Sequence, residues 1–238
     1  MDENFNKKWG AEVNYTILSM CVGDYYSAFN ITVPSWMKPS VEKVVVYTDK
    51  EYECEDERVE IRPELNFDNS GWIPAVGKKV NVVKNFLKTC ECRNLVFLDM
   101  DCVMVRDVAP VYKNEFDLAA CPGKKTANAG TWYSRVNKNL IEFVDKWGLL
   151  QKQYYNKGKG LTPHVASYHQ HAFTDLLSTI NFYPVDGHIY CSRRSLYRSS
   201  HKKWKKAVAE RDVKLLHFVH DTWRDENFVK EMVQLAEK

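Results

Sequence analysis

The sequence predicts an α/β fold, a mostly parallel sheet flanked by helices in a single compact domain. First, short apolar strands alternate with amphipathic helices through the first half of the chain, a pattern that favours a parallel, doubly wound sheet. Second, the length of 238 residues suits one large domain. Third, the composition is that of an ordinary globular protein, with 45% hydrophobic and 27% charged residues.

The first half of the chain supplies most of the expected sheet. Strands are predicted at 14–20, 41–49, 58–63 and 95–98, where apolar and β-branched residues gather. A helix is expected between the first two strands and should end near Pro34. A second helix is expected at 76–91, where four apolar residues recur at helical spacing: Val80, Val83, Phe86 and Leu87.

The second half mixes strands and longer helices. Two strands are predicted at 116–123 and 128–135, with a turn at Pro122 and Gly123. Helices are predicted at 137–155 and 167–180. A late strand or turn is expected at 214–220, and a final helix at 225–238 with Asp225 as its N-cap.

Several classes of protein are disfavoured by composition. No run reaches the roughly 18 apolar residues of a transmembrane helix, and the polar start, MDENFNKKWGAEV, has no apolar core of a signal peptide. Seven cysteines, an odd number without a C-x-x-C pair, are typical of reduced thiols. These features predict a cytoplasmic protein, and no nucleic-acid partner is expected.

Charge is distributed unevenly. Residues 1–150 hold 19 Lys and Arg against 22 Asp and Glu, whereas residues 151–238 hold 15 against 9. The excess sits in RRSLYRSSHKKWKK, Arg193 to Lys206, which has seven basic residues and no acid. Such a run is typical of a solvated helix or loop, and it also suits contact with an anionic acceptor or a membrane surface.

Two acids follow the apolar strand at 95–98 directly. Ligands of open α/β sheets bind beyond the carboxyl ends of the strands, where Asp99 and Asp101 are expected. A spacing of two puts both side chains on one side if the chain stays extended, and close carboxylates repel unless a cation lies between them. Oxygen ligands suit Mg²⁺ or Mn²⁺. Alternatively, one acid caps a turn and the other is solvated.

One enzyme class with this pattern is the haloacid-dehalogenase-type phosphatases. The stretch VFLDMDCV resembles their opening motif, which would make Asp99 a nucleophile and Asp101 a general acid. That motif opens the domain in the phosphatases, whereas here nearly 100 residues precede it. No downstream acidic pair that would hold Mg²⁺ is evident.

More of the chain resembles the GT-A glycosyltransferases, especially the glycogenin-like and nucleotide-diphospho-sugar transferase families. VFLDMDCVMVRDVAPVY is similar to their D-x-D segment, ILSMCVGDYY and KVVVYTD to their first two strands, and NAGTWYS to their N-[ST]-G strand. HQHAFTDLL is similar to their D-Q-x-x-L helix, and LLHFVHDTW to their late H-F-x-G segment. The resemblance implies a GT-A fold, with a nucleotide-binding half at about 14–107 and an acceptor and sugar half at about 108–238.

What the resemblance implies for function is transfer of a sugar from a nucleotide-diphosphate sugar, expected to be a UDP-sugar, to a saccharide or other hydroxyl acceptor, with retention. Mn²⁺ or Mg²⁺ would act as the Lewis acid on the departing diphosphate, and Gln170 would position the sugar and stabilise charge. The implied metal ligands are Asp99, Asp101 and His217. The implied substrate contacts come from Val22, Tyr26, Asp49, Lys79, Met100, Asn128, His169 and His220.

Two of these positions depart from the family pattern. His169 stands where the family has aspartate, and His220 where it has glycine. The family's diphosphate lysine has three candidates here, Lys78, Lys79 and Lys84, of which we prefer Lys79.

Other interpretations stay open for single residues. His217 also fits a core histidine, Tyr26 a packing residue and Asp49 a turn acid. His169 and His171 could instead form a zinc pair. A sugar-nucleotide-binding module without catalysis is a third interpretation of the whole chain.

Overall fold

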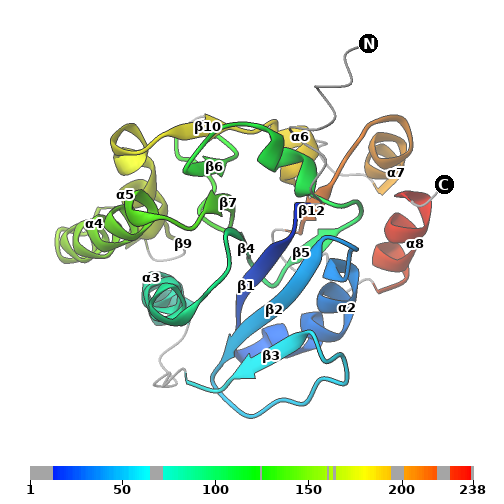
Figure 1. Cartoon of the computed structure of the whole chain (residues 1–238), viewed down its shortest axis with the longest axis horizontal. Helices are drawn as coiled ribbons and strands as arrows, with labels where there is room; N and C mark the ends of the chain where they lie inside the picture. Colours follow the sequence, from blue (N-terminus) through cyan, green and yellow to red (C-terminus); the bar gives the residue numbers. More distant parts are fainter. Residues whose placement is uncertain are drawn as a thin grey trace.

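The computed structural model describes residues 13–64, 72–123, 125–159, 161–162, 165–193, 201–218 and 226–236. A seven-stranded sheet has the order β10-β6-β7-β4-β1-β2-β3 (Figure 1). Its strands are β1 (Tyr15–Cys21), β2 (Val41–Thr48), β3 (Val59–Arg62), β4 (Asn94–Leu98), β6 (Leu118–Ala120), β7 (Thr131–Arg135) and β10 (Phe182–Pro184).

The sheet is mostly parallel, as predicted. β3, β2, β1 and β4 run parallel to one another, and β10 runs parallel to β6. β7 alone runs antiparallel to both of its neighbours, β4 and β6. Its pairing places Thr131 opposite Leu98, so the start of β7 lies beside the carboxyl end of β4.

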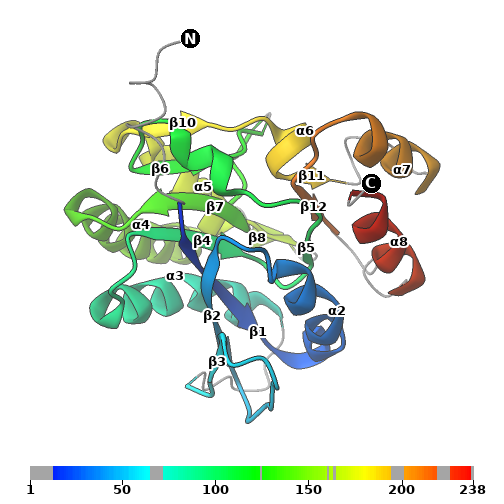
Figure 2. The same ribbon diagram turned by 45° about the vertical axis from the view of Figure 1, so that its right-hand side comes forward.

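A smaller, three-stranded sheet begins just beyond this end of β4. It consists of β5 (Cys102–Met104), β12 (Leu215–His217) and β11 (Ser192–Arg193), in the order β11-β12-β5. β12 is antiparallel to β5 and pairs His217 with Cys102. Two segments more than 100 residues apart in the chain therefore meet just after the D-x-D turn (Figure 2).

Each face of the large sheet carries its own hydrophobic cluster, because alternate residues of a strand point to opposite faces. Ile17 and Leu98 belong to one cluster, and Leu18 and Phe97 to the other. Helices α2 (Tyr26–Trp36), α7 (His201–Glu210) and α8 (Glu226–Ala236) cover the first face. Helices α3 (Trp72–Thr89), α4 (Lys138–Asn156) and α5 (Tyr168–Leu176) cover the second (Figure 1).

The remaining elements are short. They are the 3₁₀ turns η1 (Gly23–Tyr25), η2 (Ala109–Lys113) and η3 (Leu177–Thr179), the helix α6 (Gly187–Tyr190), and the strands β8 (Leu161–Thr162) and β9 (Val165–Ala166). Within the described part of the chain, no helix combines the length and the apolar character that crossing a bilayer requires. All seven cysteines are free thiols.

The first helix was expected to end near Pro34, and it ends two residues later. Helix α2 continues to Trp36, with Pro34 inside it. Trp36 is fully buried and its indole Nε1 donates a hydrogen bond to the carbonyl of Cys102, 2.8 Å away. That anchor holds the last turn in place despite the missing proline N–H. Asp225, the expected N-cap of the final helix, lies outside the described residues.

Candidate active site

Asp99 and Asp101 lie in a turn rather than in an extended strand. The amide of Asp99 donates to the carbonyl of Gly130 at 2.7 Å, and the carbonyl of Asp99 accepts from the amide of Cys102 at 3.0 Å. The condition for both acids to share one side, an extended chain, is therefore not met. The two carboxylates instead have different partners, Lys79 for Asp99 and His217 for Asp101.

Asp99 is held by a buried lysine and by the absence of a side chain at Gly130. Lys79 Nζ lies 2.6 Å from Asp99 Oδ1, and the Lys79 side chain is only 5% exposed. A β-carbon at Gly130 would lie 2.0 Å from Asp99 Oδ2, so only glycine leaves room for the carboxylate. The Asp99 side chain is 31% exposed, yet the enclosing protein raises its pKa, while the Lys79 ammonium opposes that shift.

Lys79 is distinguished by geometry from Lys84, another of the three candidate lysines. It projects from α3 toward the carboxyl end of β4, and its ammonium also lies 5.3 Å from the centroid of the Phe97 ring. Lys84, further along α3, pairs with Asp145 of α4 at 2.9 Å. Lys79 therefore reaches the acids, whereas Lys84 ties two helices together.

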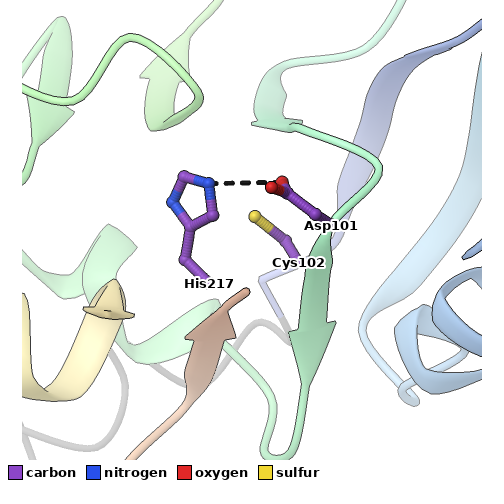
Figure 3. Close-up of side chains that lie close together, drawn as sticks. All are labelled: Asp101, Cys102 and His217. Carbon is purple, nitrogen blue, oxygen red and sulfur yellow. Dashed lines mark ion pairs between the residues drawn. The ribbon is translucent and has the colours of Figure 1, made fainter. Parts of the chain in front are cut away.

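Asp101 faces His217 across the junction of the two sheets. His217 Nε2 lies 3.2 Å from Asp101 Oδ1, and both side chains are nearly buried (Figure 3). Burial alone lowers the pKa of His217, but the Asp101 carboxylate more than offsets this and raises that pKa to about 10. The amide of Phe218 also donates to the Asp101 carbonyl at 2.8 Å, which fixes the end of β12 against the turn.

Asn128 orients the other side of the His217 ring. Its Oδ1 accepts a hydrogen bond from the amide of Gly130 at 3.0 Å, so its Nδ2 group is turned toward the histidine. Nδ2 lies 3.1 Å from His217 Nδ1 and donates to Cys191 Sγ at 2.8 Å. In the neutral ring, the bond from Asn128 to Nδ1 leaves the ring proton on Nε2, facing Asp101.

Three ligand atoms for a cation gather at this point. A carboxylate oxygen of Asp101, the sulfur of Cys102 and a ring nitrogen of His217 all lie within 4.8 Å of one another (Figure 3). Asp101 Oδ1 is buried without a hydrogen bond from any residue that the structure describes. A buried oxygen of this kind is costly unless a proton or a cation compensates it. The group therefore fits a divalent cation. We call Lys79, Asp99, Asp101, Asn128 and His217 the acidic corner.

Helix α5 brings two predicted residues toward the acidic corner. The amide of Ala127 donates to Thr174 of α5 at 2.9 Å, which joins the helix to the segment that carries Asn128. On this helix His169 is 4% exposed, and its Nδ1 is buried without a partner among the described residues. Burial, with Lys79 next, holds the pKa of His169 well below its usual value. The neighbouring Gln170 is half-buried.

Val22, Tyr26 and Asp49 lie at the carboxyl ends of β1 and β2, and we call them the Tyr26 corner. The Tyr26 hydroxyl donates to Asp49 Oδ1 at 2.7 Å, and Lys50 Nζ lies 4.0 Å from the centroid of its ring. Burial, then the bond to Asp49, raises the pKa of Tyr26. Val22 is half-buried and Asp49 is exposed, so this corner is open on one side.

Met100 connects the two corners. It is buried between Asp99 and Asp101 in sequence, and its sulfur accepts a hydrogen bond from the Thr32 hydroxyl of α2 at 3.3 Å. Its side chain therefore anchors the D-x-D turn to the helix that carries Tyr26.

Part of the predicted site lies outside the described residues. These parts are His220 and residues 194–200 of the basic run. The end of that run forms the first part of α7, where Lys205 pairs with Glu231 of α8 at 2.5 Å and Lys206 lies 3.7 Å from Glu210. Both described lysines thus have acidic neighbours from the final part of the chain.

Two thiols of the site were not among the residues predicted from the sequence. Cys102 and Cys191 are both fully buried and flank His217, with Cys191 Sγ 3.6 Å from Nδ1. Cys102 was within reach of sequence reasoning, because it directly follows Asp101. No comparable signal marks Cys191, which only the meeting of β11 and β12 brings close.

Comparison by sequence finds no protein-family model and no curated protein that matches this chain. Comparison of structures finds clear likenesses. The galactosyltransferase LgtC, in complex with donor and acceptor sugar analogs, has a TM-score of 0.59 at 10% identity, over 93% of this chain and 95% of that one. An active-site mutant of LgtC, with glutamate in place of a glutamine, has a TM-score of 0.57 at 9% identity, over 92% and 95%.

A second similar protein is the glycosyltransferase GlyE of Streptococcus pneumoniae TIGR4. Its TM-score is 0.62 at 10% identity, over 93% of this chain and 60% of that one. This chain therefore spans less than two thirds of GlyE. Both likenesses extend over 93% of this chain, and the protein has the GT-A fold that these glycosyltransferases share.

Proposed function

We propose that this protein is a metal-dependent glycosyltransferase that moves a sugar from a UDP-sugar to an acceptor hydroxyl, with retention at the anomeric carbon. The observation that carries the proposal is the pairing of Asp101 with His217, from segments 116 positions apart, at the carboxyl end of β4. It occurs in a fold shared with LgtC and GlyE, which are glycosyltransferases. Ligand sites of α/β sheets lie at this position.

The cation of this proposal is Mn²⁺ or Mg²⁺. Asp101 and His217, whose ligand atoms lie close together, would hold it, and Asp99, which pairs with Lys79, would be the third ligand. When bound, the cation supplies Lewis-acid stabilisation of the leaving diphosphate. Lys79 adds a fixed positive charge from its buried position on α3, where it needs no reorganisation.

Other residues of this chain contact the rest of the donor, namely its base, ribose and sugar. Tyr26 and Asp49 contact the base or ribose, with Val22 forming the wall of that pocket. The backbone of Met100 contacts the ribose, since it lies between the two acids. Asn128 Nδ2 is engaged by Cys191 and His217 and its Oδ1 by the amide of Gly130, so a sugar hydroxyl would donate to the second lone pair of Oδ1.

Gln170 acts on the sugar itself. It is half-buried on α5, next to His169. It positions the sugar and stabilises developing charge. LgtC has a glutamine in its active site, which supports this role. His169, held neutral beside Lys79, lines the same region, and His220 contacts the diphosphate in this proposal.

The phosphatase hypothesis loses its support in this fold. It needs Asp99 as a free nucleophile beside a general acid at Asp101, in a domain that opens with the motif. Here the fold is that of GT-A glycosyltransferases, and Asp99 Oδ1 is engaged by Lys79. A binding module without catalysis would share every contact described, so it is separated from the enzyme by turnover alone.

The test is to incubate the protein with Mn²⁺ and a panel of UDP-hexoses, with and without simple glycoside acceptors, and to follow release of UDP. Proton NMR of the first-formed product reads the anomeric configuration. UDP release that requires Mn²⁺, with retained configuration, supports the proposal. UDP binding without turnover across the panel favours the binding module, and release of inorganic phosphate from phosphomonoesters favours the phosphatase.

A further inference from the structure

The sulfur of Cys102 adds an unexpected donor to the acidic corner. Oxygen ligands suit Mg²⁺ and Mn²⁺, whereas thiolates select softer cations such as Zn²⁺ and Cd²⁺. Cys102 is fully buried, and its Sγ lies within 4.8 Å of the ligand atoms of Asp101 and His217. Figure 3 shows the three side chains converging from the D-x-D turn, β5 and β12.

We propose that Cys102 is a metal ligand and that Asp101, Cys102 and His217 form a binding site for a thiophilic divalent cation such as Zn²⁺. A carboxylate, a thiolate and an imidazole are three protein ligands, the number that open zinc sites use while one position stays available. The inference rests on the metal centre of the proposed function, but it does not require sugar transfer.

A second observation points to a ligand at this place. Asp101 is 8% exposed, and its Oδ1 has no hydrogen bond from a described residue although it faces His217 Nε2 at 3.2 Å. Asp101 Oδ1 and His217 Nε2 thus face each other beside the sulfur, and a cation bound there would take the place of the proton between them.

The surroundings of Cys102 suit a metal-bound sulfur. Thr131 Oγ1, fully buried at the start of β7, lies 3.4 Å from Cys102 Sγ. A hydroxyl at that distance can donate to a thiolate, the kind of outer contact that orients metal ligands. As the sulfur–metal bond forms, the thiol loses its proton to solvent, and no oxidant or reductant is involved.

Cys191 provides a matched control within the same site. It is as deeply buried as Cys102, but its sulfur lies 3.6 Å from His217 Nδ1, the nitrogen on the far side of the ring from Asp101. Cys191 can therefore influence His217 without contacting a cation held at Nε2.

The experiment is titration of the protein with Co²⁺, a spectroscopic substitute for Zn²⁺, while recording the near-ultraviolet absorbance. A thiolate ligand gives a sulfur-to-cobalt charge-transfer band, which oxygen and nitrogen ligands do not give. We expect the band in the unaltered protein and in Cys191→Ser, and its loss in Cys102→Ser. Cd²⁺ affinity should fall at least about 10-fold in Cys102→Ser, with a smaller change in Mn²⁺ affinity.

Circular dichroism and the thermal unfolding midpoint in the absence of metal show whether Cys102→Ser is folded. If it is not, Cys102→Ala and the Cd²⁺-to-Mn²⁺ affinity ratio of the unaltered protein take its place. Co²⁺ binding without the band, or a band that persists in Cys102→Ser, overturns the inference while leaving the proposed function intact. Failure to bind any divalent cation in the presence of UDP overturns both.

Discussion

The acidic corner and the Tyr26 corner lie at the same edge of one sheet, but they are built differently. The acidic corner joins residues from α3, the D-x-D turn, the segment before β7 and β12, and most of its side chains are nearly buried. The Tyr26 corner is made within residues 22–50, and its acid, Asp49, is exposed. The first depends on the whole fold, the second on one strand–helix–strand unit.

This difference indicates where a bound cation matters. In the acidic corner two carboxylates, an imidazole and an ammonium are held together with little solvent, so charge balance dominates the energetics. In the Tyr26 corner a phenol, a carboxylate and Lys50 already balance one another at the surface. Metal dependence should therefore be confined to substitutions in the acidic corner.

The largest effect is expected for Asp101→Asn. The change keeps the side-chain volume but removes the charge that faces His217. Metal-dependent UDP release should fall at least about 100-fold, beyond the usual loss from an outer-shell partner. Asp145→Asn, which removes only a largely exposed ion pair with Lys84 on the neighbouring helix, is the control and should behave as the unaltered protein does. Activity within a few-fold of normal would refute a ligand role for Asp101.

His217→Ala should weaken Mn²⁺ binding roughly 10–100-fold while β12 keeps its pairing with β5. Loss of the imidazole removes the nitrogen that faces Asp101. Mn²⁺ titration followed by electron paramagnetic resonance measures the affinity, and His188→Ala on α6 is the control. An unchanged titration would make His217 a core histidine without a metal role.

Gly130→Ala tests the acidic corner without altering a charged group. The new β-carbon would meet Asp99 Oδ2 at 2.0 Å, so the carboxylate must turn away from its position beside Lys79. We expect a folded protein whose UDP affinity with Mn²⁺ is about 10-fold weaker.

Gly148→Ala is the matched control for that substitution. Its β-carbon would meet the Lys84 side chain at 3.2 Å, within a helix and away from the acids. If both alanine variants bind UDP equally well, the position of Asp99 has no bearing on the donor.

Tyr26→Phe should have a smaller effect that is independent of metal. Removing the hydroxyl frees Asp49 from a 2.7 Å hydrogen bond, a change of at most about 10-fold in affinity. Calorimetric titration with UDP, with Mn²⁺ and with chelator, should show the same ratio to the unaltered protein in both buffers. A loss of UDP affinity seen only with Mn²⁺ would show that the two corners act as one unit.

The smallest effect is expected from neutralising the basic run. Replacing Lys202, Lys203, Lys205 and Lys206 by Gln should change stability by less than about 1 kcal/mol, since exposed ion pairs such as Lys205 with Glu231 contribute little. If the run guides an anionic acceptor, transfer should fall and lose its salt dependence while donor hydrolysis stays the same. If neither transfer nor its salt dependence changes, the basic run is only a solvated surface.

The two corners also differ in how far the sequence predicts them. Strand patterns placed β1, β2 and β4, and therefore the positions of Asp49 and Asp99, because local periodicity determines where a strand ends. Lys79 was only a preference among three candidates for the diphosphate lysine, since helical phase alone does not say which one faces a distant strand, and its pairing with Asp99 was not predicted. Cys191 was missed because only tertiary pairing brings it to His217.

Strands were predicted at 128–135 and, as a strand or turn, at 214–220, but neither the antiparallel direction of β7 nor the pairing of β12 with β5 and β11 was. β5 and β11 are only three and two residues long, too short for a periodic signal. Yet β12 delivers His217 to the acidic corner. The strand pairings that complete the site are therefore the part of the fold that the sequence predicts least well.

The central claim is that the acidic corner holds a divalent cation that binds the donor's diphosphate. Calorimetric titration of the unaltered protein with UDP, once with Mn²⁺ and once with chelator, tests it most directly. The account predicts UDP binding with Mn²⁺ that weakens at least about 10-fold on chelation. Equal affinity in the two buffers would contradict it, because the nucleotide would then bind without any contribution from Asp101 and His217.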